Sequence, residues 1–209
     1  MPGEIAERLL AEFNVSRESS ARLETYVDLL LSWQRRVNLI GPSTVNDIWT
    51  RHVIDALQLL RLIPDSVKVI ADLGSGAGLP GLVLAIAGGY EVHLFESNNK
   101  KAAFLRDASR QTRATAFVHA IRIEDIGKTA GLPKVDVVTA RALAPLDRLL
   151  DLAAPFLSAG AVGLFHKGRD IEAELTGATK YWRLTAVKHP SVTDSNGVIL
   201  EVKEAARVK

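Results

Sequence analysis

The chain has 209 residues, of which 47% are hydrophobic and 24% charged, and its formal net charge is +2. This length suffices for the buried core of one domain, and the charge is far below that of a protein that coats nucleic acid. No cysteine is present, which excludes disulfides, zinc–thiolate sites and cysteine nucleophiles. The N-terminal MPGEIAERLLAEF is acidic where an export signal would be apolar, so we expect a cytoplasmic protein that does not use a membrane.

The first 65 residues are expected to be helical. Apolar residues recur at helical spacing between Ser16 and Val37, and the sequence GPS at 41–43 interrupts the pattern. A second amphipathic stretch runs from Ile48 to Ile63, and Pro64 ends it. We therefore expect an N-terminal helical cap over residues 1–65.

From residue 66 onward, buried strands alternate with helices, which is typical of a mainly parallel sheet covered on both faces. A helix is expected to begin near Leu79, with Pro80 in its first turn. The polar turn SVTDSN joins the last two strands and predicts an antiparallel hairpin at one edge. We expect seven strands in one compact α/β domain over 66–209. The expected strands are 67–74, 91–96, 115–120, 134–140, 161–168, 183–190 and 197–204; the other helices are 98–113, 144–157 and 170–182.

The stretch ADLGSGAGLPG, residues 71–81, matches two cofactor motifs. Read from Gly76 it is the G-x-G-x-x-G of dinucleotide-binding proteins, and read from Asp72 it is the D-x-G-x-G-x-G of S-adenosylmethionine (SAM) methyltransferases. Glycines let the backbone approach a ligand closely, and the helix that follows offers unpaired N–H groups. Glu96, at the end of the next strand, supplies the acid that holds ribose hydroxyls for either cofactor. A third interpretation is a glycine turn that only permits tight packing.

Three features favour SAM over a nicotinamide cofactor. Asp72 lies at the strand end, where it could engage the ammonium of SAM. Glu124 and Asp125 follow the third strand, where methyltransferases contact adenine, and the reversed hairpin closes the sheet. We therefore expect a Rossmann-like SAM-dependent methyltransferase fold, with SAM converted to S-adenosylhomocysteine. An NAD-dependent oxidoreductase is the alternative.

Five segments together indicate one family more specifically than the glycine motif alone does. In their order and spacing the chain is similar to the bacterial 16S ribosomal RNA guanine-N7 methyltransferases, once called glucose-inhibited division protein B. The resemblance covers nearly the whole chain and is strongest from Trp33 to Lys167. The segments are WQRRVNLIGPSTVNDIWTRHVIDAL, ADLGSGAGLPGLVLA, ESNNKKAAFLRD, TARALAPL and HKGR.

The resemblance implies a site for SAM and a ribosomal substrate. Glu96 would bind the ribose, Ile123 and Glu124 would face the adenine, and Arg141 would belong to the SAM site and could also meet the base or a phosphate. The target would be a guanine in a decoding-region loop of 16S ribosomal RNA, in the small ribosomal subunit or its precursor, with the enzyme acting as a monomer. The residues implied on the methionine side of SAM are Gly74, Ser75, Gly76, Gly78 and Leu79.

Methylation of guanine N7 agrees with what the sequence lacks. Attack by carbon five of a pyrimidine normally needs a cysteine, and attack by an exocyclic amine commonly uses an Asn/Asp-Pro-Pro-aromatic loop, where this chain has ARALAP. N7 carries an in-plane lone pair and no proton, so alignment with the methyl group suffices. We assign no catalytic acid or base and no metal. Another RNA or small-molecule acceptor, or a SAM-binding module without turnover, remain the alternatives.

Basic residues on both sides of the expected SAM site predict a rim that meets RNA phosphates. His52 and Asp55 are three residues apart and can face each other on one helical turn, and the alternative role for His52 is a partly buried helix residue. Arg141 has the alternative role of a surface arginine paired with an acid. The residues expected on the rim are Arg36, Arg51, His52, Lys167 and Arg169.

Overall fold

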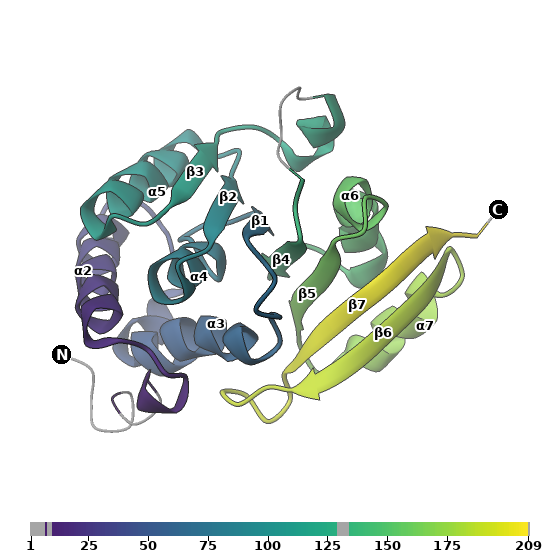
Figure 1. Ribbon diagram of the computed structural model, residues 1–209, viewed down its shortest axis with the longest axis horizontal. Helices are drawn as coiled ribbons and strands as arrows, with labels where there is room; N and C mark the ends of the chain where they lie inside the picture. Colours follow the sequence, from purple (N-terminus) through teal and green to yellow (C-terminus); the bar gives the residue numbers. More distant parts are fainter. Residues whose placement is uncertain (1–6, 8–9, 129–133, 209) are drawn as a thin grey trace.

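The computed structural model describes residues 7, 10–128 and 134–208 and contains a seven-stranded sheet between two layers of helices (Figure 1). The strand order is β3-β2-β1-β4-β5-β7-β6. No helix in these described ranges is long and apolar enough to cross a membrane. The strands are β1 Val69–Leu73, β2 Glu91–Phe95, β3 Ala116–His119, β4 Val137–Arg141, β5 Val162–Lys167, β6 Trp182–Pro190 and β7 Val198–Arg207.

The first five strands are parallel, whereas β7 pairs antiparallel with β5 and with β6. The reversal follows from chain length, because parallel neighbours need a long crossover and the seven residues 191–197 only permit a hairpin. The predicted parallel sheet with an antiparallel edge hairpin is confirmed. All five parallel strands present their carboxyl ends to the same edge, which is where open α/β sheets bind ligands.

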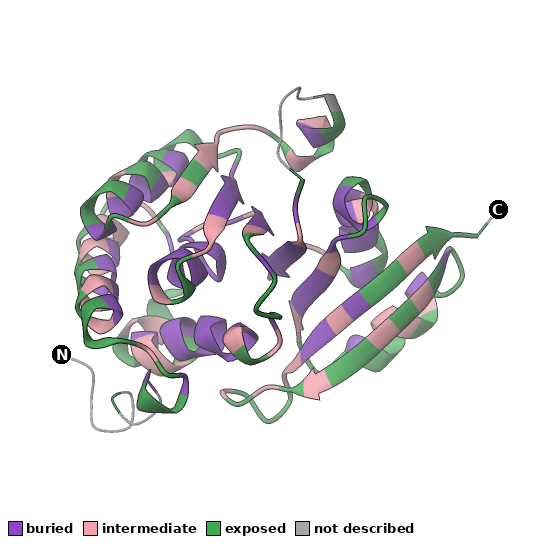
Figure 2. Ribbon diagram, in the orientation of Figure 1, coloured by how far each residue is buried: buried purple, intermediate pink, exposed green. Residues whose placement is uncertain are grey.

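The helices divide between the two faces of the sheet (Figure 1). Neighbouring strand residues point to opposite faces, so Val137 and Leu164 join one buried cluster while Val138 and Phe165 join the other. Helices α2 to α5 pack on the first face, and α6 and α7 pack on the second. Figure 2 shows that the inner strands are buried and that the hairpin is mostly half-buried or exposed. The helices are α2 Arg17–Gln34, α3 Asp55–Leu57, α4 Gly81–Gly88, α5 Asn99–Thr112, α6 Leu146–Leu157 and α7 Ile171–Ala178.

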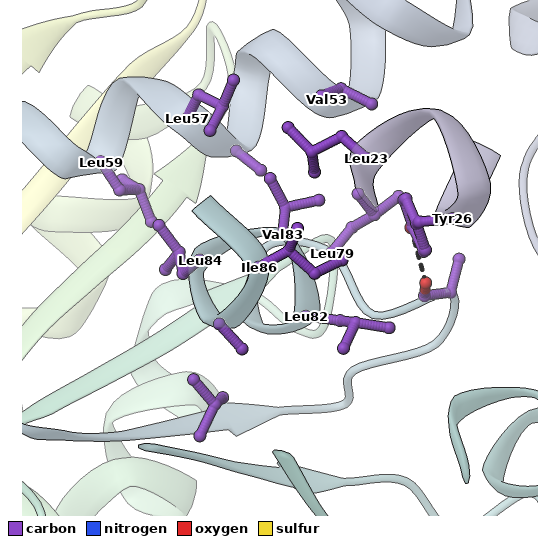
Figure 3. Close-up of a cluster of buried hydrophobic side chains, with 14 of the residues drawn as sticks. Leu23, Tyr26, Val53, Leu57, Leu59, Leu79, Leu82, Val83, Leu84 and Ile86 are labelled. Atoms are coloured by element: carbon purple, nitrogen blue, oxygen red, sulfur yellow. Dashed lines mark hydrogen bonds between the residues drawn. The ribbon is translucent and has the colours of Figure 1, made fainter. Parts of the chain in front are cut away.

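Helix α4 lies in the middle of the first layer, and its residues Leu82 to Ile86 are all buried (Figure 3). It packs against α2, where the Tyr26 hydroxyl donates a 2.7 Å hydrogen bond to the carbonyl of Ala77. Burial raises the pKa of Tyr26 above its ordinary value, so this hydroxyl keeps its proton. The N-terminal helices therefore share a core with the glycine-rich turn. The division into a cap of 1–65 and a domain of 66–209 stays a prediction.

Two helix predictions need correction. The expected helix 48–63 is helical from Trp49 to Arg61, but it combines a π-helical turn over Trp49–Ile54, the short α3 and a 3-10 turn over Gln58–Arg61. Sequence periodicity does not distinguish these windings, because each segment is only three to six residues long. Helix α4 begins at Gly81, after Pro80, because the preceding glycines hold the chain in a turn as far as that proline.

The first prediction concerns Gly81, at the start of α4. A Cβ atom there would lie 2.6 Å from the Cβ of Asp72 and 2.7 Å from a methyl carbon of Leu94. Because both neighbours are fixed in strands, we expect Gly81→Ala to lower the free energy of unfolding by about 1–3 kcal/mol, measured by urea denaturation. The control is Gly177→Ala in α7, where a Cβ meets no atom within 4 Å and should raise stability by about 0.5–1 kcal/mol. Equal effects of the two changes would contradict the argument.

Candidate functional site

The glycine-rich turn after β1 forms the floor of the site. Gly74, Gly76 and Gly78 have φ values of +68°, +54° and +85°, in the left-handed region that favours glycine. A Cβ at Gly74 would come within 2.7 Å of Leu143, and one at Gly78 within 2.7 Å of Leu82. Glycine at Gly74 and Gly78 therefore allows the turn to pack closely against these two leucine side chains.

Ser75 and Glu96 hold this turn in place. The Ser75 hydroxyl donates to the carbonyl of Asp72 at 2.9 Å, and its N–H donates to the carbonyl of Phe95 at 3.1 Å. The buried carboxylate of Glu96 accepts N–H groups from Gly76, at 2.9 Å, and from Asn98, at 2.7 Å. A carboxylate has about four acceptor positions, so Glu96 keeps two for further donors such as hydroxyl groups.

Asp72 is completely buried beneath the turn. One oxygen, Oδ1, accepts a 2.8 Å hydrogen bond from the hydroxyl of Thr139, whereas Oδ2 has no hydrogen-bond partner among the described residues. Burial raises the pKa of Asp72 to about 6, although the hydrogen bond from Thr139 lowers it. A buried acceptor without a donor is costly, so a donor that reached Oδ2 would be bound favourably.

A cavity of about 230 Å³ opens above the turn, and we call it the cofactor cavity. It contains the glycine turn residues expected on the methionine side of SAM, with the exception of Gly78, which lies behind it. Glu96, Ile123 and Glu124 lie outside this cavity. The residues that line it are Leu39, Ile40, His52, Gly74, Ser75, Gly76, Ala77, Leu79, Lys101, Arg141 and Ala142.

Arg141, the last residue of β4, lies at the edge of the cofactor cavity and is tied to the π-helical turn. Its Nε lies 3.2 Å from Oδ2 of Asp55, and its Nη2 donates to the carbonyl of Arg51 at 2.8 Å. The same Nη2 lies 3.1 Å from Nδ1 of His52. The spacing of His52 and Asp55 predicted that they face each other. In the structure both side chains instead contact the guanidinium of Arg141. Arg141 is therefore a positioned residue and not a free surface arginine.

These contacts fix the protonation of His52. Guanidinium groups only donate, so Nδ1 is the acceptor in this contact. Nε2 therefore carries the proton and donates it to the hydroxyl oxygen of Thr44 at 2.7 Å. Burial and the nearby charge of Arg141 lower the pKa of His52 to about 4. The ring is consequently neutral at physiological pH. His52 is only 6% exposed, which favours its alternative role as a buried helix residue over a contact with RNA phosphates on the rim.

The other expected rim residues differ in their exposure and in their ion pairs. Arg36 is exposed, and the side chain of Arg169 is 82% exposed with only a 4.0 Å contact to Asp170. Arg51 is half exposed, with Asp194 at 3.7 Å.

Lys167 corrects another expectation. Its side chain is 7% exposed, its ammonium lies 2.5 Å from the carboxylate of Glu174, and it donates to the carbonyl of Ala144 at 3.1 Å. This partly buried ion pair uses the charge of Lys167 inside the protein, so Lys167 is not a free cation on the rim. The sequence contained no sign of the pairing, because Glu174 comes from the following helix.

The residues expected near adenine do not line the cofactor cavity. Ile123 and Glu124 begin a 3-10 turn after β3, over Ile123–Lys128. Ile123 packs against the second hydrophobic cluster, and the half-exposed Glu124 pairs with Arg148 at 2.8 Å. Leu39, Ile40 and Ala142 line the cofactor cavity but were not predicted from the sequence. No spacing rule finds them, because they come from loops that only the fold brings to the glycine turn.

The second prediction concerns the protonation of His52. In an NMR titration of the ring, we expect the pKa of His52 to be about 4, with Nδ1 unprotonated and Nε2 protonated at pH 7. The folded protein then binds fewer protons here than the unfolded chain does, so this group makes the free energy of unfolding fall as the pH drops from about 6.5 to about 4. Arg141→Met should raise the pKa of His52 by removing the neighbouring charge. A pKa near 6.5 in the wild type would contradict the assignment.

Comparisons with known proteins agree with this geometry. Crystal structures of cofactor-bound Rv0187 from MTB and of M. jannaschii TYW2 in complex with AdoMet superpose with TM-scores of 0.58 and 0.55. The first covers 88% of this chain and 89% of that one at 14% identity, and the second 83% and 80% at 15% identity. These similarities show the fold of SAM-dependent methyltransferases, as the sequence predicted.

More similar relatives cover nearly the whole chain. The Paramagnetospirillum magneticum protein named ribosomal RNA small subunit methyltransferase G is 50% identical, with 96% of each chain covered. The Rhodospirillum rubrum protein of that name is 49% identical, with 96% of this chain and 98% of that one covered. The family model described as rRNA small subunit methyltransferase G matches residues 19–202. The chain therefore belongs to the rRNA small subunit methyltransferase G family.

Proposed function

We propose that this protein transfers a methyl group from SAM to N7 of a guanine in the 16S ribosomal RNA of the small subunit. Family membership supports the cofactor and the ribosomal RNA substrate. The observation that carries the choice of N7 is the absence of a usable base among the described residues that line the cofactor cavity. They include no carboxylate, and both ring nitrogens of the neutral His52 are hydrogen bonded.

A nucleophile that needs no deprotonation suits such a site. N7 of guanine has a lone pair in the plane of the ring and carries no proton, so the enzyme has only to align it and exclude water. An exocyclic amine or a hydroxyl would release a proton during the transfer and would need an acceptor. The cavity residues therefore favour a ring nitrogen as acceptor. We assign no catalytic acid or base.

The residues present fit SAM, which when bound supplies a methyl group on a positively charged sulfur. Gly74 and Gly76 allow the backbone to approach the methionine part, and Ser75 fixes the turn. The Oδ2 of Asp72, which has no hydrogen-bond partner among the described residues, would accept from the methionine ammonium. Glu96 would hold the ribose hydroxyls with its two remaining acceptor positions. Ile123 and Glu124 would face the adenine from the neighbouring strand end.

The cofactor cavity has two cationic side chains in its described lining, Lys101 and Arg141. Arg141 carries a positive charge at the edge, and the carboxylate of Asp55 offsets it at 3.2 Å. A protonated His52 would add a further positive charge, but burial and Arg141 hold its pKa at about 4. Arg141 would thus position the helix over the cavity and line the boundary with the incoming base.

The partner we propose is 16S ribosomal RNA within the small subunit or its precursor, in the cytoplasm, with the protein acting as a monomer. In A-form RNA the major groove is deep and narrow, so N7 of a paired guanine is hard to reach. The target would therefore lie in a loop or be turned out of its stack. Arg36, Arg51 and Arg169 would contact phosphates around the cavity. The side chain of Lys167 would not, because Glu174 already pairs with it.

The third prediction tests the activity. Small ribosomal subunits that lack the modification are incubated with SAM labelled in its methyl group, and the RNA is digested to nucleosides for mass spectrometry. We expect the label in 7-methylguanosine. Binding of SAM is measured in the same sample. If SAM binds and no nucleoside is labelled, another acceptor or a SAM-binding module without turnover replaces this proposal.

The fourth prediction tests the rim. Arg36→Ala and Arg169→Ala should each weaken binding to the RNA, and each should reduce the slope of log affinity against log salt by roughly 0.7–0.9 for a lost phosphate contact. The affinity for SAM should stay unchanged. Arg183→Ala is the matched control, because Arg183 is an exposed arginine of β6 at the end of the hairpin remote from its turn. Equal slopes for all three variants and the wild type would remove these arginines from the interface.

A further inference from the structure

We infer that the target guanine binds in a second cavity, between the helical stretch 49–61 and the β6–β7 turn, and that Asp194 selects it by its Watson–Crick edge. This inference rests on the proposed function and identifies the subsite of that reaction which recognises the base. The cavity measures about 220 Å³, and we call it the base cavity. The residues that line it are Arg51, Asp55, Arg141, Ala142, His166, Lys167, Gly168, Ser191, Thr193, Asp194, Gly197, Val198 and Ile199.

The base cavity adjoins the cofactor cavity. Arg141 and Ala142 line both, so the two spaces meet at the carboxyl end of β4. In the sheet order, β1 and β4 lie under the cofactor cavity, and β5 and β7 follow on the other side. The turn 191–197 therefore forms the wall of the base cavity that faces away from the cofactor. A planar group in this space would have one edge toward the cofactor and the opposite edge toward the turn.

Contacts with the helical stretch hold the turn in position. The hydroxyl of Thr193 donates to Oδ1 of Asp55 at 2.6 Å, and the N–H of Val192 donates to Oε1 of Gln58 at 3.0 Å. Oδ1 of Asp194 accepts the N–H of Asn196 at 2.9 Å, which fixes its side chain within the turn. A recognition group held in this way loses little freedom when a ligand binds.

The carboxylates in the base cavity differ in their availability. Asp55 is committed, because Arg141, Thr193 and Gln58 all bind its oxygens. Asp194 is about half exposed, and the cation that pairs with its Oδ2 is Arg51 at 3.7 Å, also about half exposed. Such a solvent-exposed pair is weak, so its carboxylate can exchange this contact for hydrogen bonds to a ligand.

The arrangement of hydrogen-bonding groups in guanine matches this geometry. N7 and O6 are acceptors on one side of the base, and the N1–H and N2 amino donors lie across the ring from N7. With N7 directed toward the cofactor cavity, the two donors face the turn, where the carboxylate of Asp194 accepts both. O6 then lies next to Arg141, whose Nη1 makes no hydrogen bond within the described residues.

The same carboxylate acts against the other purine. Adenine presents an acceptor at N1 beside its amino group, so its ring nitrogen would face the negative charge of Asp194 without a proton between them. Sites that bind a donor through a buried or partly buried acceptor reject analogues that lack the donor. Asp194 would therefore determine specificity by accepting from guanine and by repelling adenine.

The fifth prediction compares two bases and two carboxylates. The wild type is first shown to produce 7-methylguanosine, and the modified guanine is located. That guanine is then replaced by inosine, which lacks only the N2 amino group, through splinted ligation of the RNA. For the wild type we expect kcat/KM to fall roughly tenfold or more with inosine, since one base contact of this kind is lost. Asp194→Asn keeps an oxygen for the N–H of Asn196 but loses one of the two acceptors.

For Asp194→Asn we expect kcat/KM toward guanine to fall roughly ten- to hundredfold and the guanine-to-inosine ratio to shrink to about threefold or less. SAM affinity and thermal stability should match the wild type. Asp65→Asn is the control, because Asp65 is an exposed carboxylate before β1, toward the amino end of that strand, and lies outside the base cavity. A wild type that methylates guanine and inosine equally, an unchanged ratio in Asp194→Asn, or an equal loss in Asp65→Asn would each overturn the inference. Absence of 7-methylguanosine with the wild type would instead overturn the proposed function.

Discussion

The ion pair between Arg141 and Asp55 joins the two halves of the site. Arg141 ends β4, and Asp55 lies in the helical stretch that covers the carboxyl edge of the sheet. The same guanidinium binds the carbonyl of Arg51 and the ring of His52, so it holds about one helical turn of that stretch, from Arg51 to Asp55, over the strand end. Because Asp55 also accepts from Thr193, the β6–β7 turn is fixed through the same carboxylate. Both cavities depend on this arrangement.

The cost of breaking this network follows from burial. The side chains of Arg141 and Asp55 are 22% and 12% exposed, and removal of one partner would leave the other charge largely without water. His52 avoids the same cost by remaining neutral, with each ring nitrogen hydrogen bonded. The network thus places one compensated positive charge, that of Arg141, beside the cofactor cavity, whose lining also includes Lys101. Transfer to an acceptor that carries no proton needs no base, which agrees with a cofactor cavity whose described lining includes no carboxylate.

Much of the fold could be predicted from local patterns. The apolar runs before and after the glycine turn specify parallel strands, and the polar segment 191–196 specifies a hairpin, because these depend on neighbours within a few residues. The left-handed φ values of Gly74, Gly76 and Gly78 explain why the motif has its glycines. Helix winding was less predictable. The π-helical turn over Trp49–Ile54 is only six residues long, so the spacing of its apolar residues does not distinguish it from an α-helix.

The sequence by itself determined the fold class, the position of the glycine turn, the acid at Glu96 and the family, since each of these is written in contiguous or regularly spaced residues. Only the tertiary structure decided which charged groups are free. Lys167 and His52 were expected on the rim, but Glu174 pairs with the first, and Arg141 and Thr44 enclose the second. The physical reason is that burial and ion pairing depend on partners distant in the chain. His52 meets Arg141 across 89 positions, and Asp55 meets Thr193 across 138.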